Sequence, residues 1–148
     1  MDMKNERMMV LASWYLRLGL GAGFLSAVAD RFGLWGHNGA PQVAWGDWAH
    51  FVAYTAQLNW FLPKTLIPAL AWFATVAEAL LGLALVLGFC LRSAALASAV
   101  LLTLFAVAMT CSLGIKAPLN YSVFAAAGGA LLLGVIPRPA PRGKEKAP

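Results

Sequence analysis

Four long apolar runs constrain what this chain can fold into more than any other feature. They cover about residues 8–29, 66–89, 93–113 and 119–136. An α-helix needs roughly 20 apolar residues to cross the hydrocarbon core of a bilayer. None of the runs alternates apolar and polar residues as a barrel strand does. The pattern therefore predicts an all-α fold, an integral membrane four-helix bundle formed by a single domain over residues 1–136.

The composition agrees with this prediction. The chain is 61% hydrophobic and 11% charged, whereas a soluble domain is about 45–50% apolar. The net charge of +5 raises the question of nucleic acid, but the basic residues form no stripe with interleaved aromatics. We therefore expect a lipid bilayer as the partner and no nucleic acid.

The basic residues predict an orientation. Four spans put both termini and the turn near Arg92 on one side. That side also carries the cations Lys4, Arg7, Arg138, Arg142, Lys144 and Lys146, against Arg31, Lys64 and Lys116 on the other. The positive-inside rule places both termini in the cytoplasm. Residues 137–148 are Pro-rich and charged, which predicts a disordered cytoplasmic tail.

A competing interpretation is a cleaved signal sequence. The stretch "SAVAD" places Ala27 and Ala29 before Asp30, which resembles a signal-peptidase site. We favour retention, because the apolar run begins upstream of Arg17 and cleavage would discard that residue. A mature protein that starts at Asp30 would contradict the four-helix interpretation.

The connection between the first two runs contains a further expected element. Trp48, Phe51 and Thr55 belong to a three- and four-residue repeat that is typical of a helix. We expect a short amphipathic helix from about Asp47 to Phe61, with Asp47 as N-cap. Its tryptophans suit the extracytoplasmic membrane interface. Such a helix could be a purely structural lid or a cover over a site, and the residues leave both open.

Two charged residues lie inside the apolar runs, where charge is expensive. Arg17 is about 13 Å from the start of the first run, and Glu78 is roughly 16 Å from the end of the second. Because the two runs are antiparallel, these depths predict a buried ion pair between Arg17 and Glu78. The pair could fix helix register or form a proton or ligand site. Both interpretations stay open.

Glycines beside these residues predict close helix packing. Gly21 is one turn from Arg17 and Gly82 is one turn from Glu78. Gly19 and Gly23 form a G-x-x-x-G pair, which permits close approach of helices.

A polar and aromatic cluster is expected at the extracytoplasmic end. It combines Tyr54, Gln57, Asn59, Trp60, Lys116, Asn120 and Tyr121, with Thr110, Ser112 and Ser122 nearby. Donors, acceptors and aromatic rings beside an apolar bundle suit a carbonyl-bearing ring ligand such as a quinone head group. The alternative is an interfacial anchor with helix caps.

Other chemistry is poorly represented. His37 and His50 offer too few ligands for zinc, so we predict no metal site. Cys90 and Cys111 bracket one span and would lie about 30 Å apart, which is too far for a disulfide. No residue is assigned a catalytic role, and no cofactor other than a quinone is suggested.

Three stretches of the chain are informative together, "LRLGLGAGFL", "AEALLGLALVLGFCLRSAAL" and "GIKAPLNYSVFAAAGGALLL". In their order and spacing the chain resembles the DoxX-like small membrane proteins of bacteria. The resemblance covers about residues 10–136, and its most useful points are Arg17, Leu18, Glu78, Gly82, Gly88 and Arg92.

The resemblance implies a four-helix bundle in the bacterial inner membrane with a link to thiosulfate:quinone oxidoreductase or thiol oxidative stress. The chain would be a quinone-interacting or redox-associated subunit, with the redox centre supplied by a partner subunit or a bound quinone. Whether it is itself an enzyme stays open, as does a homo-oligomer. The alternative function is a non-enzymatic scaffold, or a binder or transporter of small apolar solutes.

Overall fold

The computed structural model describes residues 3–136, and these form helices joined by turns and one longer loop. The elements are α1 (Met3–Arg31), α2 (Trp48–Leu58), the 3₁₀ turn η1 (Lys64–Leu66), α3 (Ile67–Leu87), α4 (Leu91–Leu113), α5 (Lys116–Asn120) and α6 (Val123–Val135). Over residues 3–136 there is no strand, so the prediction of an all-helical fold is confirmed. The predicted disordered tail, 137–148, lies outside the described residues.

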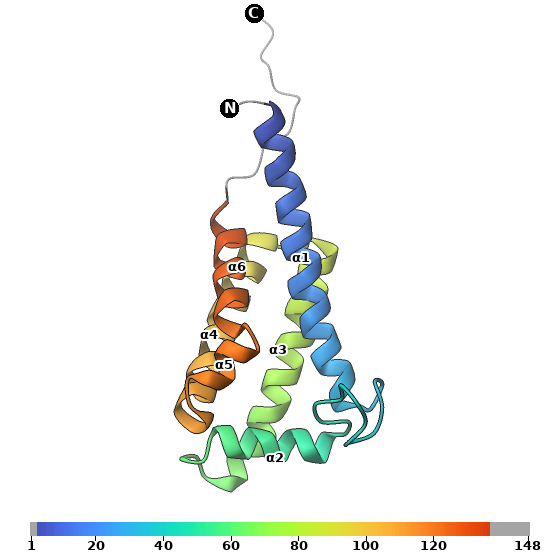
Figure 1. Cartoon of the computed structure of the whole chain (residues 1–148), viewed down its shortest axis with the longest axis vertical. Coiled ribbons are helices and arrows are strands. Elements are labelled where there is room, and N and C mark those ends of the chain that lie inside the picture. Colours follow the sequence, from blue (N-terminus) through green and yellow to red (C-terminus); the bar gives the residue numbers. More distant parts are fainter. Residues whose placement is uncertain (1–2, 137–148) are drawn as a thin grey trace, which may run out of the picture.

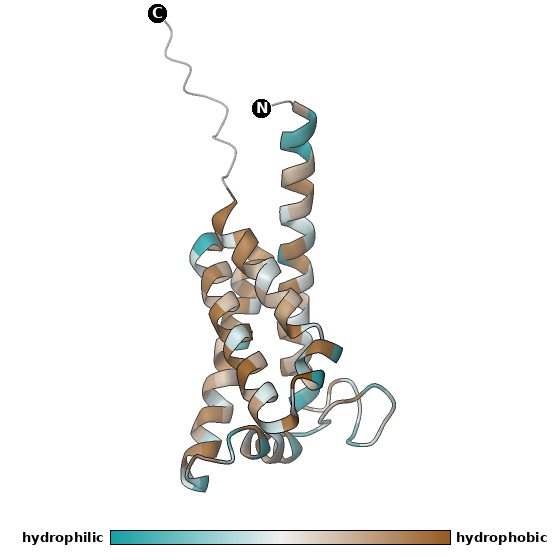
Figure 2. Ribbon diagram, turned by 60° about the vertical axis from the view of Figure 1, so that its left-hand side comes forward, coloured by the Kyte–Doolittle hydropathy of each residue, from teal (hydrophilic) through white to brown (hydrophobic). Residues whose placement is uncertain are grey.

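Three helical segments are long and apolar enough to cross a membrane. They are Met3–Arg31, Lys64–Leu87 and Leu91–Leu113. Large apolar side chains on their outer faces are exposed, for example Leu80 at 63% and Val100 at 61%. Figure 2 shows apolar residues around the helices and hydrophilic residues at the start of α1. Such a surface is unfavourable in water and is expected of helices that face lipid tails.

The helices run back and forth along one axis. The first, third, fourth and sixth are roughly parallel to that axis, and α2 lies across the end opposite both termini (Figure 1). The most extensive packing is between α1 and α3 and between α4 and α6. With 29 residues, α1 is about 43 Å long, and its first turns project beyond the other helices (Figure 1).

The predicted fourth span, 119–136, is not one continuous helix. Tyr121 and Ser122 separate α5 from α6, and Ser122 has a left-handed backbone with φ of 54°. The 13 residues of α6 extend about 20 Å, which is less than the roughly 30 Å hydrocarbon core. The turn at Ser122 thus shortens the last apolar helix.

The short helix after the first span is present. The Asp47 side chain accepts a hydrogen bond from the backbone N–H of His50, so Asp47 is the predicted N-cap. The helix ends at Leu58 rather than Phe61, because the backbone of Asn59 leaves the helical region, with φ of −119° and ψ of 44°, and its side-chain amide donates to the carbonyl of Thr55. Its location at a membrane interface stays a prediction.

Glycines let α1 and α3 approach closely at one crossing. A Cβ on Gly21 would lie 2.9 Å from the carbonyl oxygen of Gly82 and 2.7 Å from Cγ2 of Val86. The prediction that Gly21 and Gly82 allow close packing is therefore confirmed. Gly19 and Gly23 behave differently: a Cβ on either would meet no atom within 4 Å. Within residues 3–136 they form no helix contact.

Candidate functional site

A buried ion pair joins the end of α1 to the middle of α3. The Nη2 of Arg31 lies 2.7 Å from both carboxylate oxygens of Glu78, and Nη1 donates to the hydroxyl of Thr75 at 2.8 Å. The exposed fractions of the Arg31 and Glu78 side chains are 3% and 2%. Glu78 is thus paired inside the bundle, as expected, but its partner is Arg31.

The predicted pairing of Arg17 with Glu78 is wrong. Arg17 is buried and bonds instead to carbonyls at the end of α3, about 11 Å along that helix from Glu78. The depth calculation assumed that residue 8 lies level with residue 89. Because the first turns of α1 project beyond α3, Arg17 is closer to the end of the bundle than that assumption allows.

Arg17 instead satisfies the C-terminal end of α3. Gly88 adopts a left-handed conformation with φ of 76°, and its N–H bonds to the carbonyl of Ala84. The carbonyls of Leu85 and Val86 accept from Nε and Nη2 of Arg17 at 3.0 and 3.1 Å. The last carbonyls of a helix lack intrahelical partners and carry partial negative charge. Arg17 therefore has a structural function as a cap.

Aromatic rings cover the guanidinium of Arg31. Its Cζ lies 3.8 Å from the centre of the Phe51 ring of α2 and 5.3 Å from that of Trp45, within the range of cation–π attraction. One donor of Arg31 is left over. In the described part of the chain, Arg31 Nε is the one buried side-chain nitrogen or oxygen without a hydrogen-bond partner.

Asp30, next to Arg31, fixes the loop that brings Trp45 to this site. Its Oδ2 accepts from the backbone N–H of Ala44 at 2.8 Å and of Trp45 at 3.4 Å. Its Oδ1 accepts from the N–H of Gly46 at 3.1 Å. A carboxylate that accepts several backbone N–H bonds holds that backbone firmly. The last two residues of α1 thus organise the loop, α2 and α3 around one point.

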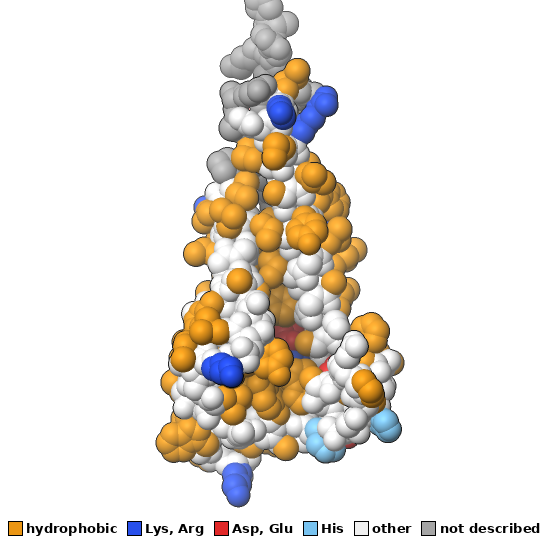
Figure 3. Space-filling model, viewed as in Figure 1, with side chains coloured by type: hydrophobic (Ala, Val, Ile, Leu, Met, Phe, Trp, Pro, Cys, Tyr) orange, Lys and Arg blue, Asp and Glu red, His pale blue; other side chains and the backbone are white. Residues whose placement is uncertain are grey.

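A mostly apolar cleft of about 260 Å³ opens beside the ion pair. From α1 it is lined by Gly19, Leu20, Gly23, Phe24, Ala27 and Arg31. The other walls are Trp45, Glu78, Leu102, Phe105 and Ala126. Figure 3 shows a hollow between α1 and the α4–α6 side, with acidic and basic atoms at its bottom, where Arg31 and Glu78 line the cleft. The cleft opens to the side, between helices whose outer faces are apolar.

The cleft explains the open space around Gly19 and Gly23. Both glycines lie on its α1 wall, and neither is in contact distance of another helix. Side chains at these positions would project into the cleft. The G-x-x-x-G spacing therefore keeps a wall of the cleft open, whereas helix contact was the prediction.

The predicted polar and aromatic cluster does not line this cleft. Its seven candidate residues are Tyr54, Gln57, Asn59, Trp60, Lys116, Asn120 and Tyr121, and none of them is among the lining residues. Gln57, Trp60, Lys116, Asn120 and Tyr121 are exposed. Ser112 donates to the carbonyl of Leu58 at 2.6 Å, which ties α4 to the end of α2.

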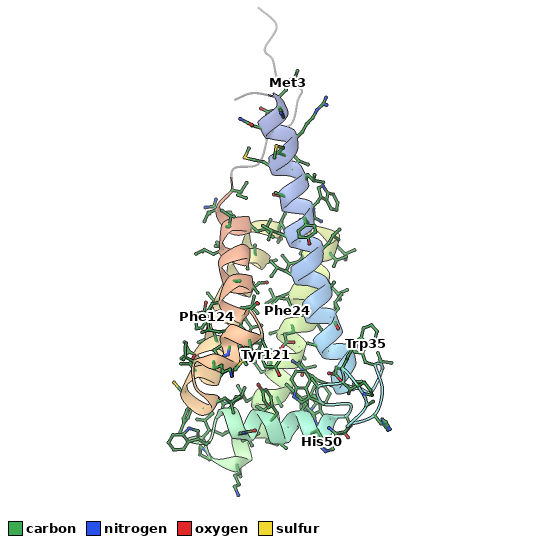
Figure 4. The ribbon with its side chains drawn as sticks, viewed as in Figure 1. Met3, Phe24, Trp35, His50, Tyr121 and Phe124 are labelled. Atoms are coloured by element: carbon green, nitrogen blue, oxygen red, sulfur yellow. The ribbon has the colours of Figure 1, made fainter. Side chains whose placement is uncertain are left out.

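Tyr54 packs beside one residue of the cleft wall. Its ring centre is 5.7 Å from that of Trp45, a lining residue. Burial, and to a lesser extent the neighbouring Tyr121, raise the pKa of the Tyr54 hydroxyl. In Figure 4, Tyr121 comes from the α5–α6 turn and Phe24 from α1.

Residues 3–136 contain neither a metal site nor a pair of bonded cysteines. No group of three His, Cys, Asp or Glu side chains is placed to hold a metal ion. His50 bonds to Asp47 through Nδ1 at 2.8 Å. Cys90 and Cys111, at opposite ends of α4, are free and exposed.

Arg31 is the site residue that sequence reasoning missed, because it was assigned to a loop just beyond the first span. A signal for it exists. Leu20, Phe24, Ala27 and Arg31 recur at steps of four, three and four residues, which places them on one face of a helix. Extending the helix by one turn would have put Arg31 on that face.

Comparisons with protein-family models, with curated proteins and with solved structures found no match for this chain.

Proposed function

We propose that this chain is a DoxX-like subunit of the bacterial inner membrane, with cytoplasmic termini, and that its cleft binds a quinone head group. The observation that carries the proposal is the position of a buried Arg31–Glu78 pair at the bottom of an otherwise apolar cleft. Ligand sites are typically apolar concavities with a few placed polar groups, and an ionisable residue inside a membrane is by default a functional candidate.

The size and the opening of the cleft suit a ligand that has one ring and an apolar tail. Its volume of about 260 Å³ is just below the roughly 300–1,000 Å³ of sites for drug-sized ligands. One ring fits this volume better than a whole lipid does. An apolar tail would leave through the side of the cleft and lie along lipid-facing residues such as Leu18 and Leu104, which are 46% and 60% exposed.

The side chains of the cleft suit a carbonyl-bearing ring. Phe24 of α1 and Phe105 of α4 provide apolar walls, and Arg31 provides a donor, Nε, that has no partner in the described part of the chain. A quinone supplies two-electron chemistry when it is bound. In this proposal the chain holds and orients the head group, while a partner subunit delivers the electrons.

Filling the cleft tests the proposal. Gly19→Leu and Gly23→Leu each place a side chain in open space on the cleft wall, and Gly128→Leu places one in open space away from it. The purified variants would be titrated with 2-decyl-1,4-benzoquinone, with ligand binding followed by tryptophan fluorescence and by thermal stability.

We expect saturable binding to the wild type and to Gly128→Leu, and a loss of about tenfold or more in affinity for both cleft variants, because the ring and the new side chain compete for one volume. A Trp45→Phe variant should lose part of the fluorescence change, since Trp45 lines the cleft. If Gly19→Leu and Gly23→Leu bind the quinone as tightly as the wild type does, the cleft is not the quinone site.

The alternative, a binder of small apolar solutes without redox function, is favoured by the same apolar lining. Decylbenzene has the ring and the tail but no carbonyl oxygen, so it distinguishes the two. If decylbenzene binds as tightly as the quinone, Arg31 contributes nothing to recognition and the alternative is correct.

A further inference from the structure

The charges in the cleft cancel, and this restricts which head groups can bind. Arg31 and Glu78 are the two charged residues among those that line it. They contact each other at 2.7 Å, with almost no exposed surface. The nearby carboxylate of Asp30 already accepts three backbone N–H groups. An incoming ligand therefore meets a neutral pair and not a free cation.

Both terminal nitrogens of the Arg31 guanidinium already donate hydrogen bonds within the protein. Nη2 is bonded to Glu78 and Nη1 to Thr75, and Nε has no partner. A carboxylate prefers to take two parallel N–H donors of a guanidinium, and each such pair includes Nη2, which both carboxylate oxygens of Glu78 already contact. A single acceptor oxygen needs only one donor.

We propose that the cleft selects uncharged head groups with a hydrogen-bond-accepting oxygen and excludes carboxylates, and that Glu78 causes this selection by occupying the anion site of Arg31. The inference rests on the proposed function and narrows its ligand class. A bound carboxylate would place a second negative charge beside Glu78 in a region of low dielectric, where like charges repel strongly. Free fatty acids would thereby be kept out.

The first experiment compares two ligands of nearly the same shape on the wild-type protein. Methyl 4-decylbenzoate has a neutral carbonyl head, and 4-decylbenzoic acid is ionised at pH 8. Each would be titrated into full-length protein in detergent, with Gly23→Leu giving the baseline for ligand that only partitions into the micelle. We expect the ester to bind at least about tenfold more tightly than the acid, because like-charge juxtaposition opposes binding by several kcal/mol.

The second experiment removes the charge of Glu78. Glu78→Gln keeps the shape and an acceptor oxygen for Arg31 but frees the positive charge, so we expect the preference to reverse in favour of the acid. Glu6→Gln, in the first turns of α1 and away from the cleft, is the matched control and should keep the wild-type preference. Should Glu78→Gln fail to fold, the double variant Arg31→Gln, Glu78→Gln replaces it, and the preference should disappear.

The possible failures are distinguishable. If the acid binds the wild type as tightly as the ester, or if Glu78→Gln leaves the preference unchanged, the inference about charge is wrong even though the cleft binds ligands. If neither ester, acid nor quinone binds more tightly to the wild type than to Gly23→Leu, the proposed function itself is wrong.

Discussion

Arg31, the last residue of α1, lies 2.7 Å from both carboxylate oxygens of Glu78 in the middle of α3. The contact fixes the end of one helix against the centre of another, at the bottom of the cleft. Removing one member of a buried ion pair leaves the other charge buried and uncompensated. Replacing both members removes both charges together with the bond between them.

This relationship predicts strong energetic coupling. Arg31→Met and Glu78→Met should each lower the free energy of unfolding by about 3–5 kcal/mol, and the double variant should lose much less than the sum. Unfolding by SDS titration in mixed micelles measures the three values.

A matched double-mutant cycle with Arg17→Met is the control. The effects of Arg17→Met and Glu78→Met should be additive within about 0.5 kcal/mol, because Arg17 and Glu78 share no bonded partner. Coupling in that second cycle would restore the original pairing of Arg17 with Glu78.

The failure of that original pairing shows what a sequence leaves out. The apolar runs predicted the long helices, because hydrophobic length is a property of each segment alone. The partner of Glu78 depends on how far α1 slides along α3, and that is set by packing. The two helices approach closely where Gly21 meets Gly82, and a count of residues from a presumed membrane edge does not predict which residues then lie at the same depth.

A second prediction concerns the cap of α3. Arg17→Ala removes the donors to the carbonyls of Leu85 and Val86. Each lost hydrogen bond to the charged guanidinium should lower the free energy of unfolding by at most about 1.5–3 kcal/mol. Gly88→Ala should destabilise the wild type in two ways. Its Cβ would lie 2.6 Å from Nη2 of Arg17, and its φ of 76° is strained for any residue with a side chain.

Only the steric part of this cost depends on Arg17. In the Arg17→Ala background, Gly88→Ala should therefore cost only about 1–2 kcal/mol of backbone strain. Unfolding free energies of the four proteins in the cycle test this. An equal cost of Gly88→Ala in both backgrounds would show that Arg17 does not occupy the space beside Gly88.

The N-cap of α2 gives a prediction about pH. Asp47 accepts from the backbone N–H of His50 at 2.9 Å and from its ring nitrogen at 2.8 Å. These bonds hold the pKa of the exposed Asp47 carboxyl below its ordinary value of 3.8. Because the folded pKa is depressed, the stabilisation is complete above the unfolded value and is lost as the pH falls through the folded one.

Carbon-13 NMR of the Asp47 carboxyl should thus show a midpoint below 3.8, with the helical shifts of α2 weakening over the same range. Asp47→Asn keeps an acceptor but cannot titrate, so its α2 shifts should stay constant there. A midpoint at or above the ordinary value would mean that the cap does not stabilise the charged form.

Helices and caps, which depend on neighbouring residues, could be predicted from the sequence more reliably than the site that several helices form together. The Asp47 cap and the helix that follows it were predicted because capping depends on neighbouring residues. The turn at Ser122 was missed, since an apolar run of sufficient length gives no sign of a left-handed residue within it. The polar cluster around Tyr121 was grouped by its place in the sequence, but the cleft draws on residues from α1, α3, α4, α6 and the loop.

The last prediction separates the two kinds of glycine on α1. Gly21→Ala would place a Cβ 2.7 Å from Val86 Cγ2 and 2.9 Å from the carbonyl oxygen of Gly82. Overpacking of this kind typically costs about 1–3 kcal/mol. Gly19→Ala adds the same methyl group where no atom lies within 4 Å, and it should raise stability by about 0.5–1 kcal/mol through helix propensity. SDS unfolding of both variants measures the difference, and opposite signs are expected. If both variants are destabilised alike, Gly19 lies against another helix, and the open wall of the cleft is wrong.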